Sequence, residues 1–190
     1  MRLNAVFFIN AALLGVGLAM DAFSVSVANG LREPDMKKRK ALFSSAVFGG
    51  FQTAMPLLGW VFAHTLFEAF ESFRRFIPWI ALALLLFIGG KMIWEGLRGE
   101  AEKTAGAGTL LVQGIATSID ALSVGLTIAE LSFGWALAEA LIIGAITFGI
   151  CAAGVWLGRK AGAVIADKAT VIGGVILILI GIEIFLKGIL

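Results

Sequence analysis

The sequence predicts an all-α polytopic membrane protein, with six transmembrane helices arranged as two inverted three-helix repeats and both termini outside. Three observations support this fold class. Of the 190 residues, 59% are hydrophobic and only 15% are charged, and the mean hydropathy is +0.98, whereas soluble domains carry about a quarter charged residues. The hydrophobic residues are collected in six separate segments. Two of these segments each contain one aspartate within nearly the same local sequence.

Each of the six apolar segments has the roughly 20 residues that a helix needs to cross the hydrocarbon core. Pro78 opens the third segment, where a missing N–H costs little, and Pro56 lies inside the second, where we expect a kink. The N-terminal segment also has features of a signal peptide, but its apolar run continues to Ala28 and is echoed later in the chain. We therefore assign it to the fold. The segments are 5–29, 41–64, 76–96, 107–129, 134–158 and 168–188.

Lysine and arginine residues predict the orientation, because cytoplasmic loops carry an excess of both. The loops after the first, third and fifth segments hold ten: Arg32, Lys37, Lys38, Arg39, Lys40, Arg98, Lys103, Arg159, Lys160 and Lys168. The opposite side holds four: Arg2, Arg74, Arg75 and Lys187. This asymmetry predicts that both termini lie outside.

The two halves of the chain resemble each other. AMDAFSVS (19–26) parallels SIDALSVG (118–125), and LLLFIGGKMIWEGL (84–97) parallels VILILIGIEIFLKGI (175–189). Because an odd number of helices separates the copies, they would cross the membrane in opposite directions, as in transporters whose site lies near the midplane between repeats. Chance similarity between leucine-rich helices is the alternative. The predicted organisation is a first repeat over 1–98, a linker over 99–108 and an inverted repeat over 109–190.

Asp21 and Asp120 are the strongest candidates for functional residues. Asp21 lies about 8 residues, or ~12 Å, from the cytoplasmic end of its helix, and Asp120 about 11 residues, or ~16 Å, from the cytoplasmic start of its own. An aspartate at this depth costs about 3 kcal/mol or more unless it faces protein, water or a cation. Such residues therefore indicate an ion pathway. The alternative is a structural pair with a buried base, for which Lys91 is the intramembrane candidate.

Further oxygen donors recur near these aspartates. The fourth segment carries a polar seam at helical spacing, made of Gln113, Thr117, Asp120, Ser123 and Thr127. Taken singly, its hydroxyl groups fit helix packing better than ligation. Glu95 would attract cations at the cytoplasmic mouth, or form an ordinary helical ion pair with Lys91. The predicted metal ligands are Asp21, Asp120, Ser24, Ser123, Gln52, Thr117 and Glu95.

The donor set also predicts the kind of ion. Carboxylates, hydroxyls and a carboxamide are hard ligands, suited to Mg²⁺, Ca²⁺ or Mn²⁺ rather than to Cu(I) or zinc. A single cysteine and a single histidine exclude a disulfide and leave little room for zinc or triad chemistry. The net charge of +2 is too small to indicate nucleic acid, and the expected surroundings are a lipid bilayer. No cofactor is expected, and the oligomeric state stays open.

At these residues the sequence resembles the MntP-type manganese efflux pumps, bacterial six-helix proteins distantly similar to lysine exporters. The resemblance implies export of Mn²⁺ across the bacterial cytoplasmic membrane by a multi-pass protein, with the aspartates at positions 21 and 120 central. One departure is Gln52, where some family members carry a glutamate. The matching stretches are AMDAFSVSVANG, FGGFQTAMPLLGW, FIGGKMIWEGLRG, ATSIDALSVGL and VILILIGIEI.

Export in this direction needs an energy source. Moving a divalent ion outward against an inside-negative potential of 100 mV costs about 4.6 kcal/mol. The chain lacks a G-x-x-x-x-G-K-[ST] nucleotide loop, so coupling to inward protons is the natural hypothesis, with Asp21 and Asp120 binding metal and protons in turn. The alternatives are export of another divalent cation or of an amino acid, an intramembrane aspartyl protease, and a passive structural subunit. The protease interpretation lacks the expected G-x-G-D pattern.

Overall fold

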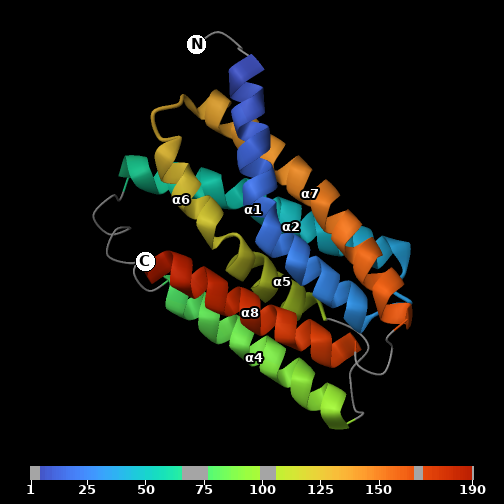
Figure 1. Ribbon diagram of the computed structural model, residues 1–190. Helices are drawn as coiled ribbons and strands as arrows, with labels where there is room; N and C mark the ends of the chain where they lie inside the picture. Colours follow the sequence, from blue (N-terminus) through green and yellow to red (C-terminus); the bar gives the residue numbers. More distant parts are fainter. Residues whose placement is uncertain (1–4, 66–76, 99–105, 165–168, 190) are drawn as a thin grey trace.

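The computed structural model describes residues 5–65, 77–98, 106–164 and 169–189, which form a helical bundle (Figure 1). Five of the predicted segments each correspond to one helix, whose ends lie within a few residues of the prediction. The fourth segment is divided into two helices. The helices are α1 (Ala5–Arg32), α2 (Lys38–Thr65), α4 (Ile77–Arg98), α5 (Ala107–Thr117), α6 (Ile119–Thr127), α7 (Phe133–Val164) and α8 (Ala169–Ile189).

The helices have the length and the apolar surface of a multi-pass membrane protein. Among the described residues, Ala5–Arg32, Lys38–Thr65 and Phe133–Gly162 are each long and apolar enough to cross a bilayer, and α4 and α8 have 22 and 21 residues. Large apolar side chains lie on the outside, with Phe87 72% exposed and Leu13 66% exposed. A water-soluble monomer rarely exposes so much contiguous apolar surface, whereas lipid solvates it.

One buried cluster joins six of the helices, α5 among them through Ala116. It contains Val25 from α1, Phe48 from α2, Leu85 from α4, Cys151 from α7 and Leu177 from α8, all 0% exposed. The contacts between helices form two groups (Figure 1). Helices α4 and α8 lie side by side as a pair, and α1 and α7 run together across α2. Helix α5 contacts both α2 and α4, and α6 packs against α2.

The closest helix contacts are made at glycines, where two backbones meet without side chains between them. On α2, a Cβ at Gly59 would lie 2.1 Å from the Leu122 carbonyl oxygen of α6. On α7, a Cβ at Gly154 would lie 2.9 Å from the Phe23 carbonyl oxygen of α1. No larger residue fits at Gly59 without moving a helix.

The expectation of one continuous helix over 107–129 is wrong, because the chain breaks between α5 and α6. Ser118 ends α5: its N–H donates to the Ile115 carbonyl at 3.1 Å and its hydroxyl donates to the Gly114 carbonyl at 2.6 Å. The carbonyl of Thr117 accepts a hydrogen bond from the Gln52 side chain at 3.2 Å. Side chains that bond to the backbone in this way compete with the regular helical ladder, and α6 starts afresh at Ile119.

Candidate functional site

Asp21 and Asp120 line the same cavity, which has a volume of about 600 Å³. They lie 99 positions apart in the sequence, so the fold brings them together. Asp21 is half-buried and Asp120 is exposed. A Cβ at Gly17, one turn before Asp21, would meet no atom within 4 Å, which agrees with the open space on this face of α1. The other lining residues are Asn10, Leu13, Leu14, Gly17 and Leu18, all from α1.

The helix break places Asp120 in the first turn of α6. The first turn of a helix carries unpaired N–H groups and a partial positive charge, so it stabilises a carboxylate. This placement offsets part of the cost of an ionised aspartate at membrane depth. Discontinuous helices of this kind line the binding sites of many secondary transporters.

Gln52 links the two segments that carry the aspartates. Its Nε2 donates to the Leu18 carbonyl of α1 at 3.0 Å and to the Thr117 carbonyl of α5 at 3.2 Å. Leu18 and Thr117 each lie three positions before an aspartate. The side chain is 0% exposed, and its Oε1 has no hydrogen-bond partner among the described residues. Gln52 therefore fixes the spacing of the two segments directly behind the cavity.

A second amide pair joins the same helices further along α1. Asn29 Nδ2 donates to Gln113 Oε1 at 2.8 Å, and Gln113 Nε2 donates back to Asn29 Oδ1 at 3.3 Å. Both side chains are buried. Together with Gln52, this pair holds α1 and α5 in register by hydrogen bonds that are buried or part-buried.

The remaining predicted ligands lie in other surroundings. The Ser24 hydroxyl donates to the Met20 carbonyl of its own helix at 3.1 Å, and that of Thr117 donates to the Gln113 carbonyl at 2.9 Å. Ser123 is half-buried on α6. None of these three is among the described residues that line the cavity, and the side chain of Glu95 lies outside the described part of the structure. Metal binding by any of the seven stays a prediction.

Sequence reasoning missed Asn10. This residue lines the cavity with Asp21 and precedes it by 11 positions, close to three helical turns. The spacing places both residues on one face of α1, and this signal was available in the sequence. Within the described ranges, no three His, Cys, Asp or Glu side chains come close enough to hold a metal ion. A metal bound here would therefore take carboxylate oxygens from the two aspartates and complete its shell with neutral oxygens or water.

Comparisons with known proteins show the family of the chain. The family described as "Putative manganese efflux pump" matches residues 35–185. A relative of that name from Clostridium perfringens (strain SM101) is 42% identical, with 94% of both chains covered. Relatives named in the same way from Methanothermobacter thermautotrophicus and Gloeothece citriformis are 43% and 41% identical, over 95% and 94% of this chain and 97% and 95% of their own. No solved structure matches.

Proposed function

The chain belongs to the MntP family of manganese efflux pumps, and from this membership we propose that it exports Mn²⁺ from the cytoplasm by alternating access. In this proposal, Asp21 and Asp120 bind the ion near the centre of the membrane. The observation that carries the assignment of the site is that both aspartates line one cavity. The family is one of transporters and not of enzymes, so the protease interpretation is set aside.

The chemistry of the cavity suits a hard divalent ion. Two carboxylates balance the charge of Mn²⁺, and carboxylate and water oxygens are ligands of the kind that this ion accepts. A volume of about 600 Å³ leaves room for a partly hydrated ion, since each water occupies ~30 Å³. Gln52, which donates to both aspartate-bearing segments, would keep the distance between them constant while the ion is bound.

An inverted two-fold relation between residues 1–98 and 109–190, joined by the linker 99–108, is part of the proposal. Leu18 and Thr117, whose carbonyls share the Gln52 amide, are separated by 99 positions, like Asp21 and Asp120. Gly154 approaches the carbonyl of Phe23, and Gly59 approaches the carbonyl of Leu122. Phe23 and Leu122 are also 99 positions apart. These recurring contacts support a repeat in three dimensions rather than a chance likeness of leucine-rich segments.

The crossing of α2 and α7 agrees with the same relation. Gly49 and Gly144 are 95 positions apart, as are Gly59 and Gly154. A Cβ at Gly49 would lie 2.8 Å from the Gly144 oxygen, and a Cβ at Gly144 would lie 2.7 Å from the Gly49 oxygen. Reciprocal contacts are expected where two related helices cross on the symmetry axis. Gln52, about one turn beyond Gly49, would then lie close to this axis, which explains how one amide reaches both halves.

The orientation follows from the ends of the helices. Arg159 Nε donates to the Pro34 carbonyl at 3.1 Å, so the basic loop between α1 and α2 and the basic end of α7 lie at the same end of the bundle. By the distribution of positive charge, this end is cytoplasmic. In this proposal the starts of α1 and α7 lie on the outer side, and both termini would lie outside.

The central test replaces each aspartate by asparagine in a strain that lacks its own manganese exporter. Asp21→Asn and Asp120→Asn remove the charge at nearly constant volume, so we expect both to abolish manganese resistance and to raise cellular Mn²⁺ to the level of the empty strain. Asp35→Asn is the matched control, because Asp35 is an exposed aspartate in the loop between α1 and α2. Full resistance in Asp21→Asn, at normal membrane expression, would remove that residue from the site.

Proton coupling is tested separately in proteoliposomes. Protons and Mn²⁺ would compete for the same carboxylate oxygens, so we expect metal movement to be accompanied by proton movement in the opposite direction. A pH-sensitive dye in the lumen measures this, with Asp21→Asn vesicles as the blank. Manganese transport that leaves the lumenal pH unchanged would contradict antiport but not export. Rates with Mg²⁺, Ca²⁺ or lysine in place of Mn²⁺ decide between manganese and the alternative substrates.

A further inference from the structure

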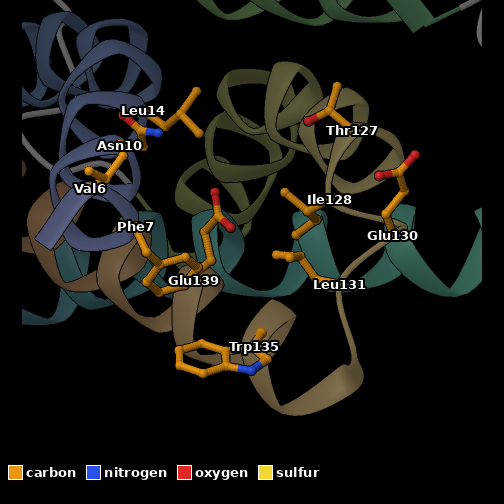
Figure 2. A pocket seen from close by; sticks show the side chains of 10 residues that line it. All are labelled: Val6, Phe7, Asn10, Leu14, Thr127, Ile128, Glu130, Leu131, Trp135 and Glu139. Carbon is orange, nitrogen blue, oxygen red and sulfur yellow. The ribbon is translucent and has the colours of Figure 1, made fainter. Parts of the chain in front are cut away.

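A second cavity adjoins the one that contains Asp21 and Asp120, on the side where α1 and α7 begin. Its volume is about 380 Å³, and it is enclosed by the start of α1, the end of α6 and the start of α7 (Figure 2). Asn10 and Leu14 line both cavities, so the two spaces follow each other along one face of α1. Its polar lining residues include Asn10, Thr127, Glu130 and Glu139.

Glu139 is the unusual residue of this cavity. It is only 6% exposed, on a helix whose neighbouring turns are apolar. Figure 2 shows its carboxylate directed into the space between α1 and the residues that follow α6. Among the described residues, its carboxylate takes part in no hydrogen bond or ion pair. The carboxylate of a residue that is so little exposed is costly to ionise unless a cation faces it. The described part of the chain supplies no such cation.

The surrounding groups suit a metal ion rather than a basic side chain or an apolar ligand. Asn10 offers an amide oxygen, and the Thr127 hydroxyl, which donates to the Val124 carbonyl at 2.8 Å, keeps its lone pairs available to accept or to ligate. Together with the carboxylate of Glu139 these are hard oxygen donors. Phe7 and Trp135 make an edge-to-face contact at 5.1 Å beside them, which gives this space an apolar wall.

We propose that Glu139 forms a second divalent-cation site, which an ion occupies between the central aspartates and the outside. Asn10 precedes Asp21 by 11 positions on α1, or ~16 Å along the helix, so the two sites are too far apart to share one ion. A second negative group on the exit side would draw the ion off the central carboxylates, because conduction needs binding that is divided over several weak sites. The role in exit rests on the proposed function, whereas the binding site does not.

The test counts manganese ions bound to the purified protein in lipid nanodiscs, from the electron paramagnetic resonance signal of free Mn²⁺. We expect two ions for the wild type and one for Glu139→Gln, which removes the charge at constant volume. Glu130→Gln is the matched control, because Glu130 is an exposed acid that lines the same cavity, and we expect it to keep both ions. Equal binding by the wild type and Glu139→Gln would overturn the proposal.

Two further measurements separate this proposal from the proposed function. The double variant Asp21→Asn/Asp120→Asn should lose the central ion and keep the one at Glu139. If Glu139→Gln binds one ion fewer than the wild type and the double variant binds as many as the wild type, the central site is rejected and the site at Glu139 stands. On the wild type, a dipolar distance measurement between the two bound ions should give ~16 Å, as estimated from the helical rise. This readout needs no variant, and a single ion at saturating Mn²⁺ would overturn the second site.

Discussion

At the scale of single residues, one amide holds together the two segments that carry the aspartates. An amide hydrogen bond contributes about 1 kcal/mol net, whereas a buried carbonyl left without a partner costs about 1–3 kcal/mol. Gln52 donates to two backbone carbonyls with one nitrogen. An ionised glutamate at this position would have no N–H to donate. In this protein, therefore, the second helix contributes a cross-link where a carboxylate would contribute charge.

The first prediction concerns this cross-link. Gln52→Leu removes both hydrogen bonds and leaves the carbonyls of Leu18 and Thr117 without this donor, so we expect it to lower the free energy of unfolding by about 2–4 kcal/mol. The fall should appear in the thermal unfolding midpoint of the purified protein. Ser44→Ala is the control, because the buried Ser44 hydroxyl has no hydrogen-bond partner in the described structure, and its removal should be nearly neutral. Equal midpoints for the two variants would contradict the role given to Gln52.

At the scale of helices, contacts between backbones decide which helices meet. The crossing of α2 and α6 is the tightest described: a Cβ at Gly59 would lie 2.1 Å from the Leu122 oxygen, and one at Gly125 would lie 2.3 Å from the Pro56 oxygen. Pro56 lies inside α2, whose helix continues past it to Thr65. The same crossing supports α6, a helix of nine residues that carries Asp120. We infer that the position of Asp120 depends on this glycine contact.

The second prediction compares two glycines of α2. Gly59→Ala forces the helices apart, so we expect loss of the monodisperse peak in size-exclusion chromatography and of manganese resistance. At Gly50 a Cβ would meet no atom within 4 Å, so Gly50→Ala should keep the fold. It should also raise stability by about 0.5–1 kcal/mol, because alanine loses less entropy in a helix than glycine. If Gly59→Ala behaves like Gly50→Ala, the α2–α6 contact is not as close as the structure has it.

At the scale of the whole molecule, the distribution of charge predicts how the bundle lies in the membrane. Lys37–Lys40 and Arg159–Lys160 are held at one end by the contact between Arg159 and Pro34. The opposite end carries the cavity of Glu139, which opens near Glu130 and Trp135. The proposed export path therefore runs from the basic end to the acidic end, so that the outer acids attract the departing cation.

The third prediction is a labelling pattern in intact cells. Ser132 and Lys37 are both exposed. Ser132 directly precedes α7 and Lys37 directly precedes α2, and these two helices begin at opposite ends of the bundle (Figure 1). The native Cys151 is 0% exposed, so it should contribute little background. Ser132→Cys should react with a membrane-impermeant maleimide, and Lys37→Cys should react only after the cells are opened. The reverse pattern would place both termini inside and would turn the proposed path around.

The helices themselves were largely predictable, whereas the helix break at Ser118 was not. Spans follow from local apolar length, because a backbone in lipid must satisfy its own hydrogen bonds within a helix. At the break, Gln52 reaches the Thr117 carbonyl from a different helix, a contact that the local sequence does not indicate. Ser24 was predicted as a ligand from its position on the same helix face as Asp21; its hydroxyl donates within its own helix, and metal binding by it stays a prediction. Helical spacing therefore predicts which residues share a face, without predicting what that face contacts.

By itself the sequence determined the membrane class, the approximate helix limits and the two intramembrane aspartates, because each depends on hydrophobicity along a short stretch of chain. The tertiary structure alone decided that Asp21 and Asp120 line one cavity, that Gln52 joins the segments behind them, and that Glu139 lies buried beside Asn10. These outcomes depend on contacts between residues about 30 to 130 positions apart. Such contacts are set by how closely glycine-bearing helices approach, which no local pattern encodes.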